Sequence, residues 1–140
     1  MLSAYPACFF KEENGYSVIF PGLNHLATCG ETLDEALAMA IDCLAGYLYL
    51  LRKDGEIAPD PLPMNKVNLS DIAKELEIES SESFINMVTV DVAEYARTHF
   101  ERSVKKTLTI PAWLNAAAIE RHINFSQVLQ EALKQKIQIK

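Results

Sequence analysis

The sequence predicts an α+β protein built from two modules, a βββαβ module followed by a short βαα module. Within residues 1–92, short apolar strands are separated by glycine and proline breaks and followed by one long amphipathic helix. From residue 103 the pattern changes to one β-branched strand and two helical stretches. Strands and helices that do not alternate regularly favour an α+β fold over a parallel α/β fold.

The composition is that of an ordinary globular protein, with 49% hydrophobic and 23% charged residues in 140. No apolar run approaches the roughly 18 residues of a membrane span, and no secretory signal pattern opens the chain. Three cysteines without a close pair indicate neither a disulfide framework nor a zinc motif. We therefore expect a cytoplasmic protein with no cofactor and no metal.

Charge is divided unevenly along the chain. Residues 1–100 hold 6 basic and 16 acidic side chains, a net charge of −10, whereas residues 101–140 hold 7 basic and 3 acidic ones, a net charge of +4. An acidic module repels nucleic acid and attracts basic proteins, whereas a small basic module can bind phosphates. Two modules with different partners would explain this asymmetry, although short segments also vary in charge by chance.

Three strands are predicted before the long helix. Residues 3–11 are rich in aromatic and small apolar side chains, and the Asn14-Gly15 pair after them is typical of a hairpin turn. Residues 16–20 form the second predicted strand, which ends at Pro21-Gly22. Residues 26–29 form a short third strand.

The helix that follows is the strongest local signal. Thr32 and Glu35 have the spacing of a capping box, which satisfies free amides at a helix start. Apolar residues then keep helical spacing as far as Leu51. They are Leu33, Ala36, Leu37, Ala40, Ile41, Leu44, Leu48 and Leu51.

The rest of the first module is less regular. Three prolines in residues 58–63 exclude a helix or a central strand there, so we expect an extended crossing. Residues 70–77 are predicted as a short helix capped by Ser70. Residues 83–92 alternate apolar and polar side chains, which predicts a fourth strand in the same sheet. The first domain thus covers residues 1–92, and residues 93–102 are predicted to be a linker.

The second domain, residues 103–140, is predicted to be a strand at 105–110 and two helices at 113–122 and 125–137. Pro111 ends the strand. One strand and two helices in so few residues cannot enclose a core alone, so this domain is expected to form a dimer.

Two short phrases give the second domain a resemblance to the ribbon–helix–helix DNA-binding family. They are Thr107-Leu108-Thr109-Ile110-Pro111 and Asn124-Phe125-Ser126-Gln127. Joined to a βββαβ module, this tail makes nearly the whole chain similar to the HicB antitoxin family, whose first domain is a degenerate RNase H-like fold. The phrases of the first domain are Tyr5-Pro6-Ala7, Phe20-Pro21-Gly22 and Glu35-Ala36-Leu37.

Membership of this family would imply a function and its partners. The protein would be an antitoxin that neutralises a HicA-type mRNA endonuclease toxin by direct binding and represses its own operon at operator DNA. It would be a homodimer through its second domain, and a higher hetero-oligomer with the toxin stays open. No enzymatic activity and no membrane partner are expected.

The resemblance implies a DNA-binding site whose residues can be named from strand parity. If Leu108 and Ile110 face the core, alternate residues of the strand enter the major groove. Those residues are Lys105, Thr107 and Thr109, whose side chains can contact base edges. Lys106 can reach phosphate with its long stem. Asn124, Phe125 and Ser126 begin the last helix, where free amides favour a phosphate. Thr107 and Thr109 could instead be ordinary solvent-facing strand residues, and Asn124 a cap alone.

Three alternatives remain from the sequence. An RNase H-like nuclease needs clustered carboxylates around two metal ions, and only Asp42 and Asp91 lie at broadly suitable places. The two last helices could form a helix–turn–helix, although the lysine-led strand before them favours the ribbon. A ribbon–helix–helix transcriptional repressor with an N-terminal small-molecule sensor domain is the other functional hypothesis, and it predicts a ligand pocket in residues 1–92.

Overall fold

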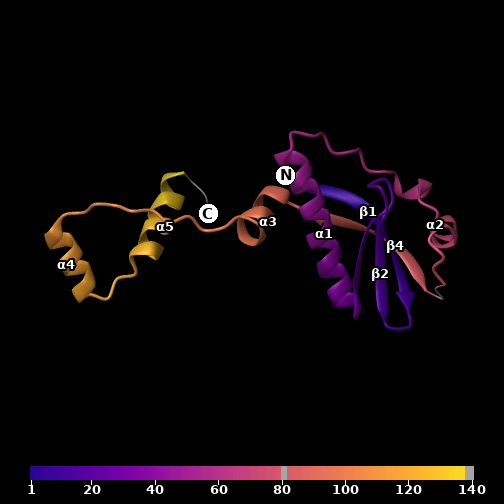
Figure 1. Ribbon diagram of the computed structural model, residues 1–140, viewed down its shortest axis with the longest axis horizontal. Helices are drawn as coiled ribbons and strands as arrows, with labels where there is room; N and C mark the ends of the chain where they lie inside the picture. The colour runs from indigo at the N-terminus through magenta and orange to yellow at the C-terminus, as the bar shows by residue number, and fades with distance from the viewer. Residues whose placement is uncertain (80–81, 138–140) are drawn as a thin grey trace. The chain divides into compact units, whose positions relative to one another are not determined.

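The computed structural model describes residues 1–79 and 82–137, and the chain divides into two compact units (Figure 1). We call residues 1–102 the N-terminal unit and residues 103–140 the C-terminal unit. Each unit is described by itself. Within the described ranges, every helix is too short or too polar to cross a membrane.

The N-terminal unit contains a four-stranded antiparallel sheet with the order β3-β2-β1-β4. Its strands are β1 (Ser3–Glu12), β2 (Gly15–Phe20), β3 (Leu26–Gly30) and β4 (Ser83–Val90). Cys8 pairs with Ile19 on one side and with Ile85 on the other, so β1 lies between β2 and β4. The α+β class and the fourth strand in the same sheet are confirmed.

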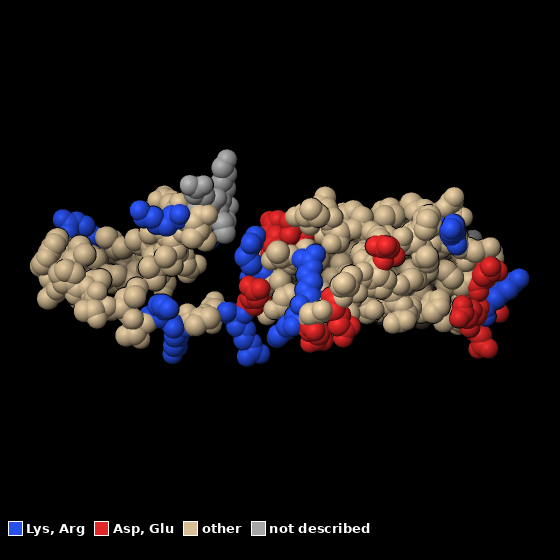
Figure 2. All heavy atoms as spheres, turned by 90° about the horizontal axis from the view of Figure 1, so that it is seen from above, with Lys and Arg blue, Asp and Glu red and all other residues tan. Residues whose placement is uncertain are grey.

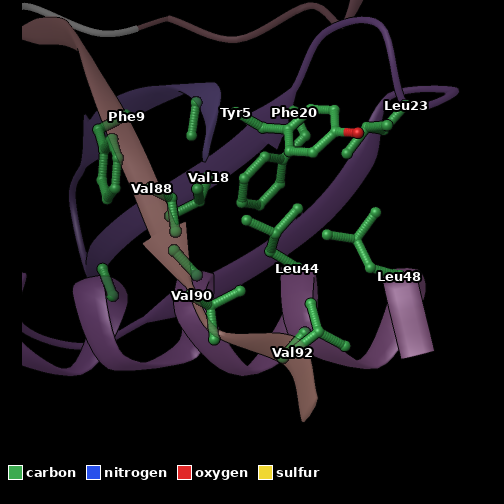
Figure 3. Packing of buried hydrophobic residues seen from close by; sticks show 14 residues of the cluster. Tyr5, Phe9, Val18, Phe20, Leu23, Leu44, Leu48, Val88, Val90 and Val92 are labelled. Carbon is green, nitrogen blue, oxygen red and sulfur yellow. The ribbon is translucent and has the colours of Figure 1, made fainter. Parts of the chain in front are cut away.

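One long helix, α1 (Leu33–Lys53), covers one face of the sheet. The Oγ1 atom of Thr32 accepts a hydrogen bond from the Glu35 amide at 3.1 Å, as the capping pattern predicts. Figure 3 shows aromatic and aliphatic side chains of the strands packed against the helix. The fully buried members of α1 are Ala36, Ala40, Leu44 and Ala45. Burying these side chains removes apolar surface from water, which is the main favourable term in folding.

The second face of the sheet carries a smaller core. Cys8, Phe10 and Ile19 of the sheet are buried with Ile72 of α2 (Leu69–Glu75). Burial raises the pKa of the Cys8 thiol to about 11, so this thiol stays protonated at neutral pH.

The predicted cap of α2 at Ser70 is wrong. The helix begins at Leu69, and the Oδ1 atom of Asn68 accepts a hydrogen bond from the Asp71 amide at 3.1 Å. Asparagine is as good an N-cap as serine. Because Asn68 already occupies the cap position, Ser70 lies within the first helical turn. A one-turn 3-10 helix, η1 (Met64–Lys66), precedes α2.

Residues 93–102, predicted to be a linker, instead belong mostly to a helix of the N-terminal unit, α3 (Val92–His99). Val92 and Ala96 are buried, and the Tyr95 hydroxyl donates a hydrogen bond to Oδ1 of Asp42 on α1 at 2.8 Å. Burial and the neighbouring Asp42 raise the pKa of Tyr95 to about 12, so the hydroxyl keeps the proton it donates. β4 accordingly ends at Val90, because Asp91 caps α3 by accepting from the Glu94 amide.

The C-terminal unit contains α4 (Ala112–Glu120) and α5 (Phe125–Lys136), close to the predicted helices. The strand predicted at 105–110 is absent from this single chain, where residues 101–111 adopt no regular secondary structure. A strand is defined by its ladder of backbone hydrogen bonds, and the described part of the unit provides no second strand to complete one.

The central position of Leu44 predicts a large effect on stability. Leu44→Ala should lower the free energy of unfolding by about 2–5 kcal/mol, because the fully buried side chain leaves a cavity between α1 and the sheet. Leu50→Ala, on the same helix but 59% exposed, should change it by less than about 0.5 kcal/mol. Urea unfolding followed by circular dichroism measures both, and equal losses would contradict the packing described here.

Candidate nucleic-acid interface

The four predicted strand residues of the site lie in one exposed segment. Lys105, Lys106, Thr107 and Thr109 are all exposed to solvent within residues 101–111. No hydrogen bond or ion pair joins their side chains to any other residue in the described ranges. Two ammonium groups and two hydroxyl groups are therefore open to an outside partner.

The apolar residues between them are not buried as strand parity predicts. Leu108 is 57% exposed and Ile110 is 40% exposed. They alternate with Thr107 and Thr109, so the side-chain pattern of a two-faced strand is present in the sequence. The core that one face needs is incomplete in this single chain, so the burial of Leu108 and Ile110 in a dimer stays a prediction.

The start of α5 has the geometry predicted for it. The Oδ1 atom of Asn124 accepts a hydrogen bond from the Gln127 amide at 3.1 Å, which makes Asn124 the N-cap. Phe125 and Ser126 follow in the first turn, where Phe125 is 45% exposed and Ser126 is also exposed. The amides of a first helical turn and the positive end of the helix dipole favour an anion at this place.

The end of α4 fixes the turn that leads to this cap. His122 has a φ of 53°, in the left-handed region common just after a helix, and its amide donates to the Ile119 carbonyl. The Arg121 guanidinium donates to the Ala117 carbonyl at 3.2 Å. Both residues therefore stabilise the C-terminal end of α4.

A large apolar surface of the C-terminal unit is open to solvent. Among its large hydrophobic side chains, Trp113 is 71% exposed and Ile119 is 58% exposed. Others more than 40% exposed are Val104, Leu108, Leu114, Ile123, Phe125, Val128, Leu133 and Ile137. Soluble proteins rarely expose so many apolar groups on a small unit unless a partner covers them.

Charged groups of the N-terminal unit gather in two hollows that no sequence motif revealed. A hollow of about 460 Å³ at the β1–β2 hairpin is lined by four glutamates, and we call it the acidic hollow. They are Glu12, Glu13, Glu31 and Glu35. A second hollow, of about 510 Å³, includes Arg52, Lys53 and Arg97. Their residues come from separate strands, helices and loops, so spacing along the chain carries no signal for them.

The two acids considered for a nuclease are engaged in structural contacts. Asp42 accepts the hydrogen bond from Tyr95, and Asp91 caps α3 while its other carboxylate oxygen lies 3.1 Å from the Met1 ammonium. The hydrogen bond from the Glu94 amide, together with the Met1 ammonium, lowers the pKa of Asp91. Over residues 1–79 and 82–137, no group of three or more His, Cys, Asp or Glu side chains is arranged to hold a metal ion.

A family of known proteins and two of its relatives match parts of this sequence. Residues 5–133 match the family described as HicB-like antitoxin of bacterial toxin–antitoxin systems. Antitoxin HicB 2 of Photorhabdus laumondii is 39% identical over 57 residues, which are 41% of this chain and 41% of that protein. Antitoxin HicB 1 of the same organism is 40% identical over 55 residues, 39% of this chain and 36% of that protein. These matches thus span less than half the length of each relative.

A solved structure extends the likeness over almost the whole chain. A chain of a toxin–antitoxin complex from Streptococcus pneumoniae is 37% identical, with a TM-score of 0.62. The alignment covers 97% of this chain and 99% of that one. The resemblance inferred from the sequence is therefore confirmed: this chain belongs to the HicB-like antitoxin family of bacterial toxin–antitoxin systems.

Proposed function

We propose that this protein is a cytoplasmic antitoxin that neutralises a HicA-type mRNA endonuclease with its N-terminal unit and represses its own operon with its C-terminal unit. The observation that carries the proposal is the pairing of an acidic folded unit with a basic unit whose apolar surface and polar segment 105–109 are both open. Family membership supports the antitoxin role over a repressor with a small-molecule sensor.

The DNA-binding half of the proposal requires a dimer. Two copies of segment 105–110 can pair as antiparallel strands, which supplies the ladder that one chain lacks. Leu108 and Ile110 would then be buried beneath the ribbon, and Lys105, Thr107 and Thr109 would point together into a major groove. A phosphate bound at the start of α5, where Asn124 is the cap and Phe125 and Ser126 form the first turn, would fix the register of the protein on the duplex. Lys106 of the ribbon would contact a second phosphate.

The toxin-binding half depends on charge and on apolar contact. An endonuclease that binds mRNA must present a basic surface to phosphates. The N-terminal unit has an excess of carboxylates, and it can compete for that surface. Charge mainly speeds association, whereas apolar contacts set the lifetime of the complex.

Dimerisation through the C-terminal unit has a direct test. The full chain should be a dimer in solution, because the exposed apolar side chains of residues 103–137 need a second copy to cover them. A fragment of residues 1–102 should be a monomer at the same concentration. Light scattering coupled to size exclusion measures the mass of both. A dimeric fragment would place the dimer interface in the N-terminal unit and contradict the proposal.

Base recognition by the ribbon has a second test. Replacing Thr107 and Thr109 together by Ala should weaken operator binding by about 1–3 kcal/mol for each lost base interaction and relax sequence preference at particular positions. Lys106→Ala should weaken binding to all sequences alike and lower the salt dependence. Thr89→Ala, an exposed threonine of β4, is the matched control. Unchanged affinity and preference in the double variant, measured by fluorescence anisotropy, would refute the ribbon assignment.

Toxin binding by the N-terminal unit has a third test. The fragment 1–102 should bind the purified toxin with an association rate that falls as salt rises, and it should rescue cells that express the toxin without repressing the operon. The physical reason is electrostatic steering by the excess of carboxylates. If the fragment folds by circular dichroism but neither binds nor rescues, the antitoxin assignment of this unit fails.

A further inference from the structure

The second hollow of the N-terminal unit has an unusual concentration of cations for an acidic unit. It lies where the C-terminal end of α1 meets α3, and its charged lining consists of Arg52, Lys53, Arg97 and Glu101. We call it the basic hollow. Three of the 6 basic residues among residues 1–100 line it, against one carboxylate. In Figure 2 blue side chains gather on one part of the larger unit, next to red ones.

The cations of the basic hollow have no hydrogen-bonding partner in the part of the chain that the structure describes. Arg52, Lys53 and Arg97 are exposed, and none makes a hydrogen bond or ion pair with a described residue. A basic residue at the end of a helix often only stabilises the helix dipole. Arg121 shows that arrangement, since it donates to a carbonyl of its own helix, whereas these three side chains do not.

Helix dipoles do not account for the charge of the hollow. The last residues of α1 and the first residues of α3, Val92 and Ala93, both line it. A helix C-terminus carries a negative partial charge and a helix N-terminus a positive one, so the two contributions oppose each other. The side chains that line the hollow carry three positive charges against one negative charge, and this lining favours an anionic ligand.

The walls of the basic hollow are held in place by the packing of α3. Val92 and Ala96 are buried, and the Tyr49 ring lies 5.4 Å from the Phe100 ring, centroid to centroid. The hydrogen bond from Tyr95 to Asp42 joins the two helices. A ligand that binds across α1 and α3 thus meets cations on a preformed frame, which lowers the cost of ordering them.

The basic hollow is close along the chain to the segment predicted to read DNA. Glu101 lines the hollow and Lys105 begins the predicted ribbon. Three residues lie between them, so their Cα atoms are at most about 15 Å apart. The acidic hollow is next to the first turn of α1, and α1 of 21 residues is about 30 Å long. The basic hollow is thus the one of the two hollows that is tethered closest to the predicted DNA-reading segment.

We propose that the basic hollow binds backbone phosphates of the DNA that flanks the operator, which gives the N-terminal unit a DNA contact of its own. This inference rests on the proposed DNA-binding function. Duplex DNA carries one negative charge per roughly 1.7 Å of axis, so DNA that flanks the operator offers a dense row of phosphates to a cationic hollow tethered near the ribbon. The contact reads no base and lengthens the footprint on either side of the operator.

The test compares two duplexes and two double variants of the full-length protein by fluorescence anisotropy. The short duplex covers only the operator, and the long one adds about ten base pairs, one helical turn, on each side. Arg52→Gln with Arg97→Gln removes two charges from the hollow. Lys66→Gln with Lys74→Gln removes the same charge from η1 and α2 of the same unit. Thermal unfolding by circular dichroism checks that both variants fold.

Wild type should bind the long duplex more tightly than the short one. Arg52→Gln/Arg97→Gln should bind the long duplex roughly tenfold or more weakly at about 0.1 M salt, with a salt slope shallower by about one for each phosphate that it no longer neutralises. It should keep its affinity for the short duplex, and the Lys66→Gln/Lys74→Gln control should match wild type on both.

Three results would overturn the inference. If both double variants lost the same affinity for the long duplex, the effect would come from net charge and not from the hollow. If Arg52→Gln/Arg97→Gln lost the same affinity for both duplexes, the hollow would not contact the flanking DNA. Unchanged DNA binding with weaker binding to the purified toxin would assign the hollow to a protein partner. A wild-type protein that fails on the short duplex would instead refute the proposed function itself.

Discussion

The close packing of α1 on one face of the sheet is the constraint on which the N-terminal unit depends. The helix approaches the end of β3 so closely that a Cβ atom on Gly30 would lie 2.4 Å from the Ala36 amide nitrogen. Small residues at Ala36 and Ala40 allow this approach, and Leu44 fills the centre of the interface (Figure 3). The same packing places the acidic hollow beside the first turn of α1 and the basic hollow beside its last.

The described part of the C-terminal unit, in contrast, lacks a closely packed core in this single chain. Its helix α5 is well capped, but its apolar side chains remain exposed and its predicted strand is unformed. A segment of this size gains too little from burial to offset its conformational entropy alone. Its helices and caps are therefore encoded within one chain, whereas a covered core and a β-ladder are what the proposed dimer would supply. One chain thus holds a unit with its own buried core and a unit whose core the proposed dimer would complete.

The sequence was informative where a signal is local. Alternation and turn residues located the strands of the N-terminal unit within one or two residues, and Asn124 was recognised as a cap. The sequence predicts a linker at residues 93–102, because the few buried side chains of α3 are buried only by contact with α1.

One of the candidate sites could be predicted from the sequence and the other could not. Segment 105–109 could be named from strand parity because a ribbon presents a contiguous run of residues. Arg52 and Arg97 could not, because they lie 45 positions apart and share a hollow only through the contact of α1 with α3.

The fold of the N-terminal unit distributes its charged side chains unevenly. A net charge of −10 over residues 1–100 would by itself repel DNA from any module attached to it. Within the unit, four glutamates line the hollow beside the first turn of α1, and three cations line the hollow beside its last turn. Because Glu101 lines the basic hollow, the chain leaves the unit beside these three cations. In the proposed function, the glutamates of the acidic hollow are available to a basic toxin, and the cations of the basic hollow are available to DNA.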